Sequence, residues 1–239
     1  MIVENGQWLM LGASDGDPDM IHDFDELVSY VDRVGFLPLF SNGVEGFSAE
    51  EHCDPRFWWT GHETRDPWEW RVYAARSRRL VYGKFFAGKA GFISLEWLPV
   101  FANYRRNGYD FDSLYEEGMA RHRSKCIMKL FEDRDALFSH EIKEMAGFGK
   151  GGLKNFSGIM TELQHSLYLI VTDFEQKRSK RGEKYGMPVA QYAMPESIFS
   201  YEAVTAAYNE EPGVSKDRIY SRVRELYPGS SEKELKKLL

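Results

Sequence analysis

Cysteine is scarce in this sequence of 239 residues, which contains only Cys53 and Cys126. The two lie far apart, have no metal-type spacing and cannot form a disulfide framework, so a reducing cytoplasm is the expected environment. The sequence has no apolar run near the roughly 18 residues that would span a bilayer, and its first residues lack the basic and apolar regions of a signal peptide. We therefore expect a cytoplasmic protein without a membrane span.

An excess of positive charge is also missing, because the formal net charge is -6 and the pI is about 5.6. These values argue against a protein whose whole surface binds phosphate. The charge is unevenly distributed, however. Residues 1–60 contain 12 acidic and 2 basic side chains, whereas residues 121–192 contain 9 acidic and 13 basic ones. Since salt screens exposed charges beyond about 10 Å, we expect these two parts to have different tasks.

With 43% hydrophobic and 15% aromatic residues, the chain can bury a substantial core. Its latter part has the order of a winged helix-turn-helix, with a basic loop at residues 177–181 between two strands. The predicted elements are a second helix at Ser139–Ala146, a turn at Gly147–Gly152, a third helix at Leu153–His165 and strands at Tyr168–Phe174 and Pro188–Met194. The fold class is α+β and mainly helical.

Apolar periodicity and helix stop signals predict the remaining elements. Helices are expected at Asp23–Val34, Glu69–Arg79, Leu95–Arg106, Asp112–Phe131, Glu196–Tyr208, Lys216–Leu226 and Ser231–Leu239, and strands at Leu80–Phe86 and Ala90–Ser94. We divide the chain into an acidic, aromatic-rich part (1–115), a winged helix-turn-helix (116–199) and a C-terminal helical extension (200–239).

The glycines at 147, 149 and 152 match the G-x-G-x-x-G pattern of dinucleotide sites. That pattern requires a preceding strand in a βαβ unit, whereas an amphipathic helix precedes it here. A phosphate-binding loop is also excluded, because Gly-Lys-Ser/Thr does not follow. The pattern favours the tight turn of a helix-turn-helix, where glycine permits positive φ, with some other loop as the alternative.

The third helix and the basic loop carry the candidate DNA contacts, because their side chains suit phosphates and base edges. A protein-contact role for the helix and a merely solvated loop remain the alternatives. The candidates are Lys150, Lys154, Asn155, Ser157, Thr161 and Gln164 on the turn and helix, and Lys177, Arg178, Lys180, Arg181 and Lys184 on the loop.

A tryptophan-rich segment contains Trp58, Trp59, Trp68 and Trp70. It could line a pocket for a flipped base, with Asp66 or Glu69 as the acid or base, or it could be structural core with surface carboxylates. His52, Cys53 and His62 are three loosely spaced residues without a fourth ligand, so we expect no metal site and no cofactor.

Three stretches carry a resemblance to a known family: Gly35–Phe40, Tyr82–Arg106 and the region from Arg121 to Glu196. Over residues 34–199 the chain resembles the winged-helix DNA glycosylase superfamily that contains AlkZ and YcaQ, in particular its AlkZ-related members. The resemblance implies two winged-helix-like units packed together. In that superfamily a Gln-x-Gln pair positions the water that hydrolyses the N-glycosidic bond.

The sequence differs from that superfamily at the positions that match the superfamily's catalytic residues. The stretch that matches the Gln-x-Gln pair is Leu37–Phe40, which has no glutamine, and a His-Glu-Ala element of the family appears here as Gly88–Ala90. We therefore expect a protein that binds duplex DNA, related to base-damage repair, with lost or altered glycosylase activity. An active glycosylase that uses Asp66 or Glu69, and a protein-interaction or small-ligand module without DNA, are the alternatives.

Overall fold

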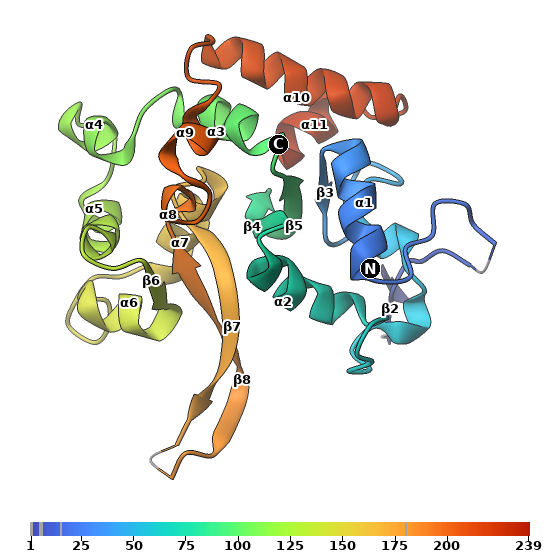
Figure 1. The fold of residues 1–239 in the computed structure, drawn as a ribbon, viewed down its shortest axis with the longest axis horizontal. Coiled ribbons are helices and arrows are strands. Elements are labelled where there is room, and N and C mark those ends of the chain that lie inside the picture. Colours follow the sequence, from blue (N-terminus) through green and yellow to red (C-terminus); the bar gives the residue numbers. More distant parts are fainter. Residues whose placement is uncertain (1, 5–6, 15, 180) are drawn as a thin grey trace.

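The computed structural model describes residues 2–4, 7–14, 16–179 and 181–239 (Figure 1). Its α-helices are α1 (Phe24–Val34), α2 (Pro67–Ser77), α3 (Leu98–Arg106), α4 (Phe111–Glu116), α5 (His122–Met128), α6 (Ser139–Met145), α7 (Phe156–His165), α8 (Pro195–Phe199), α9 (Tyr201–Thr205), α10 (Pro212–Leu226) and α11 (Glu232–Leu238). Short 3-10 helices are η1 (Ala49–His52), η2 (Pro55–Phe57) and η3 (Lys129–Phe131). The strands are β1 (Ile2–Glu4), β2 (Gln7–Leu9), β3 (Phe36–Pro38), β4 (Leu80–Phe86), β5 (Lys89–Ser94), β6 (Ala136–Phe138), β7 (Ile170–Arg178) and β8 (Lys184–Ala193).

The centre of the molecule is an antiparallel six-stranded sheet in the order β3-β5-β4-β7-β8-β6. The two halves of this sheet have the same strand order from their outer edges inward, β3-β5-β4 from residues 24–94 and β6-β8-β7 from residues 122–193. We call these stretches the first unit and the second unit. In each unit a helix is followed by an edge strand, a further helix or 3-10 helices, another helix and a hairpin whose second strand pairs with the edge strand.

The two units meet along the middle of this sheet. β4 of the first unit pairs with β7 of the second at Tyr82 and Val171. Each unit also packs a helix against the other unit's central strand, since α2 contacts β7 and α7 contacts β4. The joint therefore combines one backbone pair with helix packing from both units.

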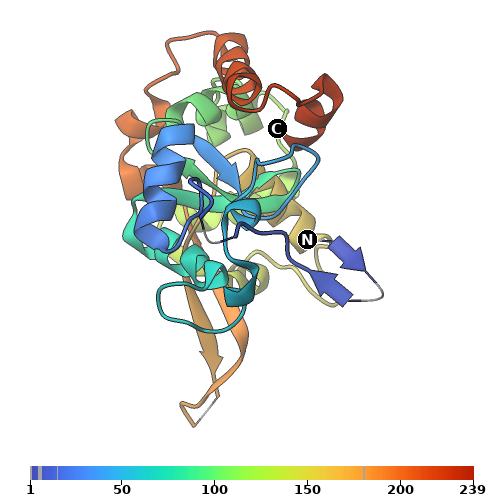
Figure 2. The same cartoon turned by 90° about the vertical axis from the view of Figure 1, so that its right-hand side faces the viewer.

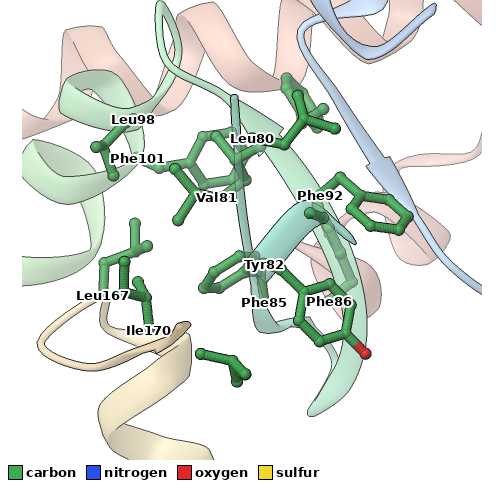
Figure 3. Close-up of a cluster of buried hydrophobic side chains, with 14 of the residues drawn as sticks. Leu80, Val81, Tyr82, Phe85, Phe86, Phe92, Leu98, Phe101, Leu167 and Ile170 are labelled. Atoms are coloured by element: carbon green, nitrogen blue, oxygen red, sulfur yellow. The ribbon is translucent and has the colours of Figure 1, made fainter. Parts of the chain in front are cut away.

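Apolar side chains from both units form one buried core, part of which is drawn in Figure 3. Phe85, Phe86 and Phe92 on the β4–β5 hairpin are fully buried beside Phe101 of α3. Burial of each such side chain stabilises the fold by roughly 1.5–3 kcal/mol relative to exposure. The core thus anchors the strands on which the candidate site is built.

Most predicted elements are confirmed, and the local signals explain why. α1 begins after Asp23, whose side chain accepts a hydrogen bond from the backbone N–H of Glu26, and ends at Gly35 with φ 98°. The β4–β5 hairpin has the predicted bounds within one residue. Among the described residues, no helix is both long enough and apolar enough to cross a membrane.

Four predicted elements are wrong in detail. The helix expected over residues 112–131 is divided into α4, α5 and η3, and Gly118 lies in the break with φ 73°. The helix expected over residues 196–208 is divided at Ser200, where φ is 76°. The strands β7 and β8 are longer than expected, so the hairpin projects well beyond the sheet in both views (Figures 1 and 2).

Candidate nucleic-acid interface

The glycine-rich segment forms a tight turn between α6 and α7, as the sequence predicts. Gly147 has φ 78°, and its carbonyl oxygen accepts a hydrogen bond from the backbone N–H of Leu153 at 2.9 Å. A Cβ atom on Gly152 would lie 2.3 Å from that same oxygen, so the turn requires glycine there. α7 begins at Phe156, three residues later than predicted, because Asn155 before it has φ 68°.

The N-terminal end of α7 presents a polar and basic surface. Lys150, Lys154, Asn155 and Ser157 are exposed and Thr161 is half-buried. Arg123 at the start of α5 joins this surface by donating a hydrogen bond to the carbonyl oxygen of Lys154 at 3.2 Å. Most of the predicted side chains on the turn and at the start of α7 are therefore exposed.

The prediction that Gln164 faces outward is wrong. Its side chain is 1% exposed, its Nε2 donates to the carbonyl oxygen of Met160, and its Oε1 accepts from the backbone N–H of Lys84 at 3.2 Å. α7 is covered on a second side by β4 of the first unit, so a position that is polar in the helical pattern becomes part of the joint between the units.

The β7–β8 hairpin carries the predicted basic loop. Arg181 is exposed, Lys180 lies outside the described residues, and so do the side chains of Lys177, Arg178 and Lys184. The backbone pairs Lys177 with Tyr185 and Arg178 with Lys184, so these cations extend along the strands and are not confined to the turn. Tyr185 and Met187 on β8 are 53% and 75% exposed, so two large side chains lie on the surface of the hairpin.

The tryptophan-rich segment is partly core and partly surface. Trp58 and Trp70 are buried, Trp68 is half-buried, and Trp59 is 53% exposed with φ 59°. The rings of Trp58 and Trp68 both lie against Phe40, at centroid distances of 5.5 and 6.4 Å. The predicted pocket of four tryptophans is therefore mostly a packed corner with one exposed indole.

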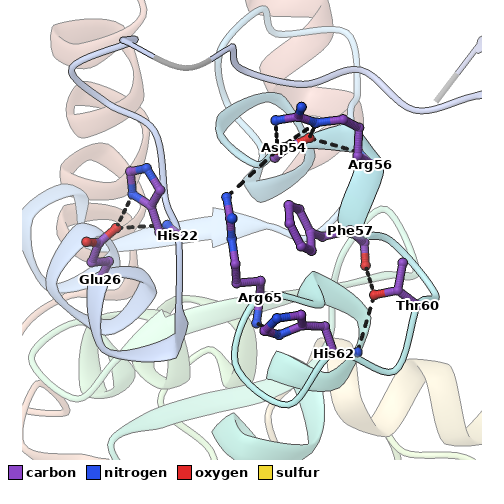
Figure 4. A network of polar contacts seen from close by, with 8 residues as sticks. All are labelled: His22, Glu26, Asp54, Arg56, Phe57, Thr60, His62 and Arg65. Carbon is purple, nitrogen blue, oxygen red and sulfur yellow. Dashed lines mark hydrogen bonds and ion pairs between the residues drawn. The ribbon is translucent and has the colours of Figure 1, made fainter.

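Polar contacts fix the loop that presents this indole (Figure 4). Asp54 accepts hydrogen bonds from Arg56 and lies 3.8 Å from the guanidinium of Arg65, and these contacts hold the pKa of Asp54 below its usual value. The Arg65 guanidinium also lies 3.9 Å from the ring centre of Phe57. Trp59 is thus displayed on an anchored loop.

Asp66 is a structural cap at the start of α2. The side chain is 1% exposed and accepts backbone N–H groups from Trp59 at 3.0 Å, Gly61 at 2.8 Å and Trp68 at 2.9 Å. With both oxygens engaged by three donors, this carboxylate is unsuited to proton transfer. Glu69, the other candidate acid or base, is half-buried and lines a cleft of about 270 Å³ between α2 and the β7–β8 hairpin.

The sequence pattern did not single out Arg71, which lines the same cleft. The residue is 5% exposed, and its guanidinium lies 4.0 Å from the ring centre of Trp68 and 4.3 Å from that of Phe174. Burial lowers the pKa of Arg71. The sequence pattern predicts an exposed arginine here, because other charged residues of the helix lie near it. Its burial follows from the packing of the hairpin on α2, which the sequence pattern does not show.

The two segments that match the family's catalytic elements lie side by side. The backbone N–H of Leu39 donates to the carbonyl oxygen of Ala90 at 2.9 Å. Near them is a cavity of about 580 Å³, bounded by Asn42, the β4–β5 turn and α11, with Lys89, Lys233 and Lys237 in its wall. Glu234 also lines this cavity, so three lysines face one carboxylate.

Metal-binding groups do not gather in the described ranges, where no cluster of three or more His, Cys, Asp or Glu side chains could hold an ion. His52 instead hydrogen bonds through Nε2 with the carbonyl oxygen of Gly46 at 2.8 Å, and Cys53 is buried as a free thiol.

Comparison with known proteins gives one match. A family model described as AlkZ related matches residues 21–239. Neither the curated proteins nor the solved structures contain a match.

Proposed function

Because the chain belongs to the AlkZ-related family, we propose that it binds duplex DNA as a relative of the DNA repair glycosylases, through the N-terminal end of α7 and the β7–β8 hairpin. The observation that carries this proposal is the paired order of the six-stranded sheet. Helix, edge strand, helix, third helix and hairpin recur in both units, as in two winged helices joined at their central strands.

Charge supports this assignment of the surface. Cations repeat along the hairpin and around the start of α7, although the whole chain has a net charge of -6. Like charges opposite one another on a hairpin destabilise it, and an anionic partner removes that cost. The acidic first part of the chain would then orient the second unit toward DNA.

Burial argues against the family's glutamine chemistry in this chain. Leu37 and Leu39, within the stretch that matches the Gln-x-Gln pair, are completely buried in the core. A buried leucine offers no amide to orient water, and a glutamine there would need partners that the core does not provide. The proposal is therefore one of binding, and the glycosylase mechanism is not carried over.

Affinity for a duplex as a function of salt tests the proposal. Each phosphate contact contributes about 0.9 to the slope of log K against log salt concentration. We expect the slope to fall by about 2 to 4 when four hairpin cations become glutamine, namely Lys177, Arg178, Lys180 and Arg181. Fluorescence anisotropy with a labelled duplex measures both the affinity and the slope.

A matched control uses four cations on the helices that lie at the other end of the molecule from the hairpin (Figure 1). Replacing them by glutamine should leave the slope within about 1 of the wild-type value. The control residues are Lys216, Arg218 and Arg224 of α10 and Lys236 of α11. Equal slopes for both variants, or no duplex binding at low salt, would reject the proposal.

A further inference from the structure

Gly158 lies in the first turn of α7, where the backbone itself does not require glycine. The residue is helical, and its φ is outside the positive range that favours glycine. Glycine in a helix is also less favourable than alanine. A Cβ atom at this position, however, would lie 2.5 Å from Oδ1 and 2.7 Å from Nδ2 of Asn155. The glycine therefore leaves the space in which this amide lies.

The backbone that carries the amide is held on both sides. Asn155 has φ 68°, a left-handed conformation that asparagine tolerates. Its carbonyl oxygen accepts a hydrogen bond from the backbone N–H of Ile159 at 3.1 Å. The residue before it, Lys154, is fixed by the hydrogen bond from Arg123. Such preorganisation reduces the entropy that is lost when a partner binds.

The helix does not use this amide in the usual way. Asparagine at the start of a helix commonly accepts a hydrogen bond from the helix backbone. Asn155 makes no such bond, although it directly precedes the first turn, and it is exposed. A donor and an acceptor at a fixed position are therefore available to a partner.

The chemistry of the amide restricts the group that it fits. An asparagine side chain has an acceptor oxygen beside an NH₂ donor. In the major groove adenine presents the acceptor N7 beside the N6 donor, which complements both groups. Guanine presents two acceptors there, and a phosphate presents acceptors alone, so either would leave the amide oxygen unpaired. Adenine is the better match.

We propose that Asn155 reads a paired adenine in the major groove, with N7 accepting from the amide and the N6 amino group donating to it. This inference rests on the proposed DNA binding through the same end of α7. The exposed Lys150 and Lys154 precede Asn155 and suit the flanking phosphates. Gln164, the other amide among the candidates on α7, is buried against β4 and cannot reach a base.

Selection from a randomised duplex library tests the proposal with the wild-type protein. We expect the bound duplexes to share an adenine at one position. Replacing that base by 7-deazaadenine removes only the N7 acceptor and should weaken binding by at least about 5-fold. Fluorescence anisotropy compares the two duplexes at one salt concentration, because affinity for DNA depends on salt.

Two variants remove the amide from its place in different ways. Asn155→Gly deletes it and keeps the left-handed backbone. Gly158→Ala displaces it, and should leave the melting temperature unchanged or higher because alanine favours the helix. Both variants should bind the adenine and 7-deazaadenine duplexes equally. Ser157→Ala, at an exposed position in the same turn, is the matched control and should keep the difference.

The outcomes separate the two proposals. Duplex binding without a selected adenine, or with equal affinity of the wild type for 7-deazaadenine, overturns the adenine contact and leaves DNA binding in place. A preference that survives either Asn155→Gly or Gly158→Ala also overturns it. Absence of binding to every duplex overturns the proposed function, and the adenine contact with it.

Discussion

The helices α2 and α7 occupy the same place in the two units but present different surfaces. α2 begins at a buried carboxylate, Asp66, and turns Trp70 and Arg71 toward the interior. α7 begins at an exposed Asn155 and leaves Ser157 exposed on its first turn. The start of α2 therefore holds a loop through its cap, whereas the first turn of α7 is polar and exposed.

The hairpins of the two units also differ, in their length and in what their turns contact. The β4–β5 turn at Ala87 and Gly88 is short and lies against the second unit, where a Cβ atom on Gly88 would lie 3.3 Å from Thr161. The β7–β8 hairpin extends away from the sheet and carries the basic loop (Figure 2). Two units with one strand order therefore differ in their helix caps and in the length of their hairpins.

The largest effect that we expect is a difference in stability between variants of the two helix caps. Asp66→Ala removes an acceptor from three backbone N–H groups, so we expect the free energy of unfolding to fall by about 3 kcal/mol. Asn155 makes no side-chain cap hydrogen bond and has positive φ, so Asn155→Gly should change it by less than about 0.5 kcal/mol. Urea denaturation measures both values. Equal losses would show that the caps are equivalent.

The next largest effect that we expect is a pH dependence of stability that arises at the end of α7 and not at the end of α2. α2 ends at the exposed Ser77, whereas α7 ends at His165, whose pKa is lowered to about 4 by burial and by repulsion from Arg105. Between about pH 6.5 and 4 this histidine is protonated in the unfolded chain, where its pKa is near 6.5, but not in the folded protein. Stability from this residue is therefore present above about pH 6.5 and is lost as the pH falls toward 4.

We expect this loss to be about 3 kcal/mol at pH 4, because the pKa of His165 is about 2.5 lower in the folded protein than in the unfolded chain and each unit corresponds to 1.36 kcal/mol. The measurement is the difference between wild type and His165→Gln in the free energy of unfolding at pH 4 and pH 7. Carboxylates such as Asp54 titrate in both proteins and cancel in that difference. Parallel pH profiles would show that the pKa of His165 is the same in the folded and unfolded chain.

Elements with local signals could be predicted from the sequence. α1 has a capping aspartate before it and a glycine after it, and the turn before α7 needs glycine because of its own backbone. The division of residues 111–131 could not be predicted, because the apolar periodicity continues across Gly118 while the backbone turns. Local signals therefore gave the elements and missed the break.

The candidate site divides in the same way. The exposure of Lys154 and Ser157 follows from the apolar face of one helix, so it could be predicted. The burial of Gln164 and Arg71 depends on contact with the other unit, through β4 and through Phe174 of β7. Contacts between units that are distant in sequence leave no periodic pattern in either helix. Residues at such joints are found only in the folded molecule.

The smallest expected effect concerns base removal. On duplex DNA methylated at purines, we expect no abasic sites above the protein-free control for either wild type or Glu69→Gln, scored by alkaline cleavage. Leu37 and Leu39 are buried and Asp66 is occupied by backbone donors, which leaves Glu69 in the cleft as the remaining candidate carboxylate. Abasic sites made by wild type and lost in Glu69→Gln would assign catalysis to the first unit. The two units would then have different functions: the cleft beside α2 in the first unit would remove the base, and α7 and the hairpin of the second unit would bind the DNA.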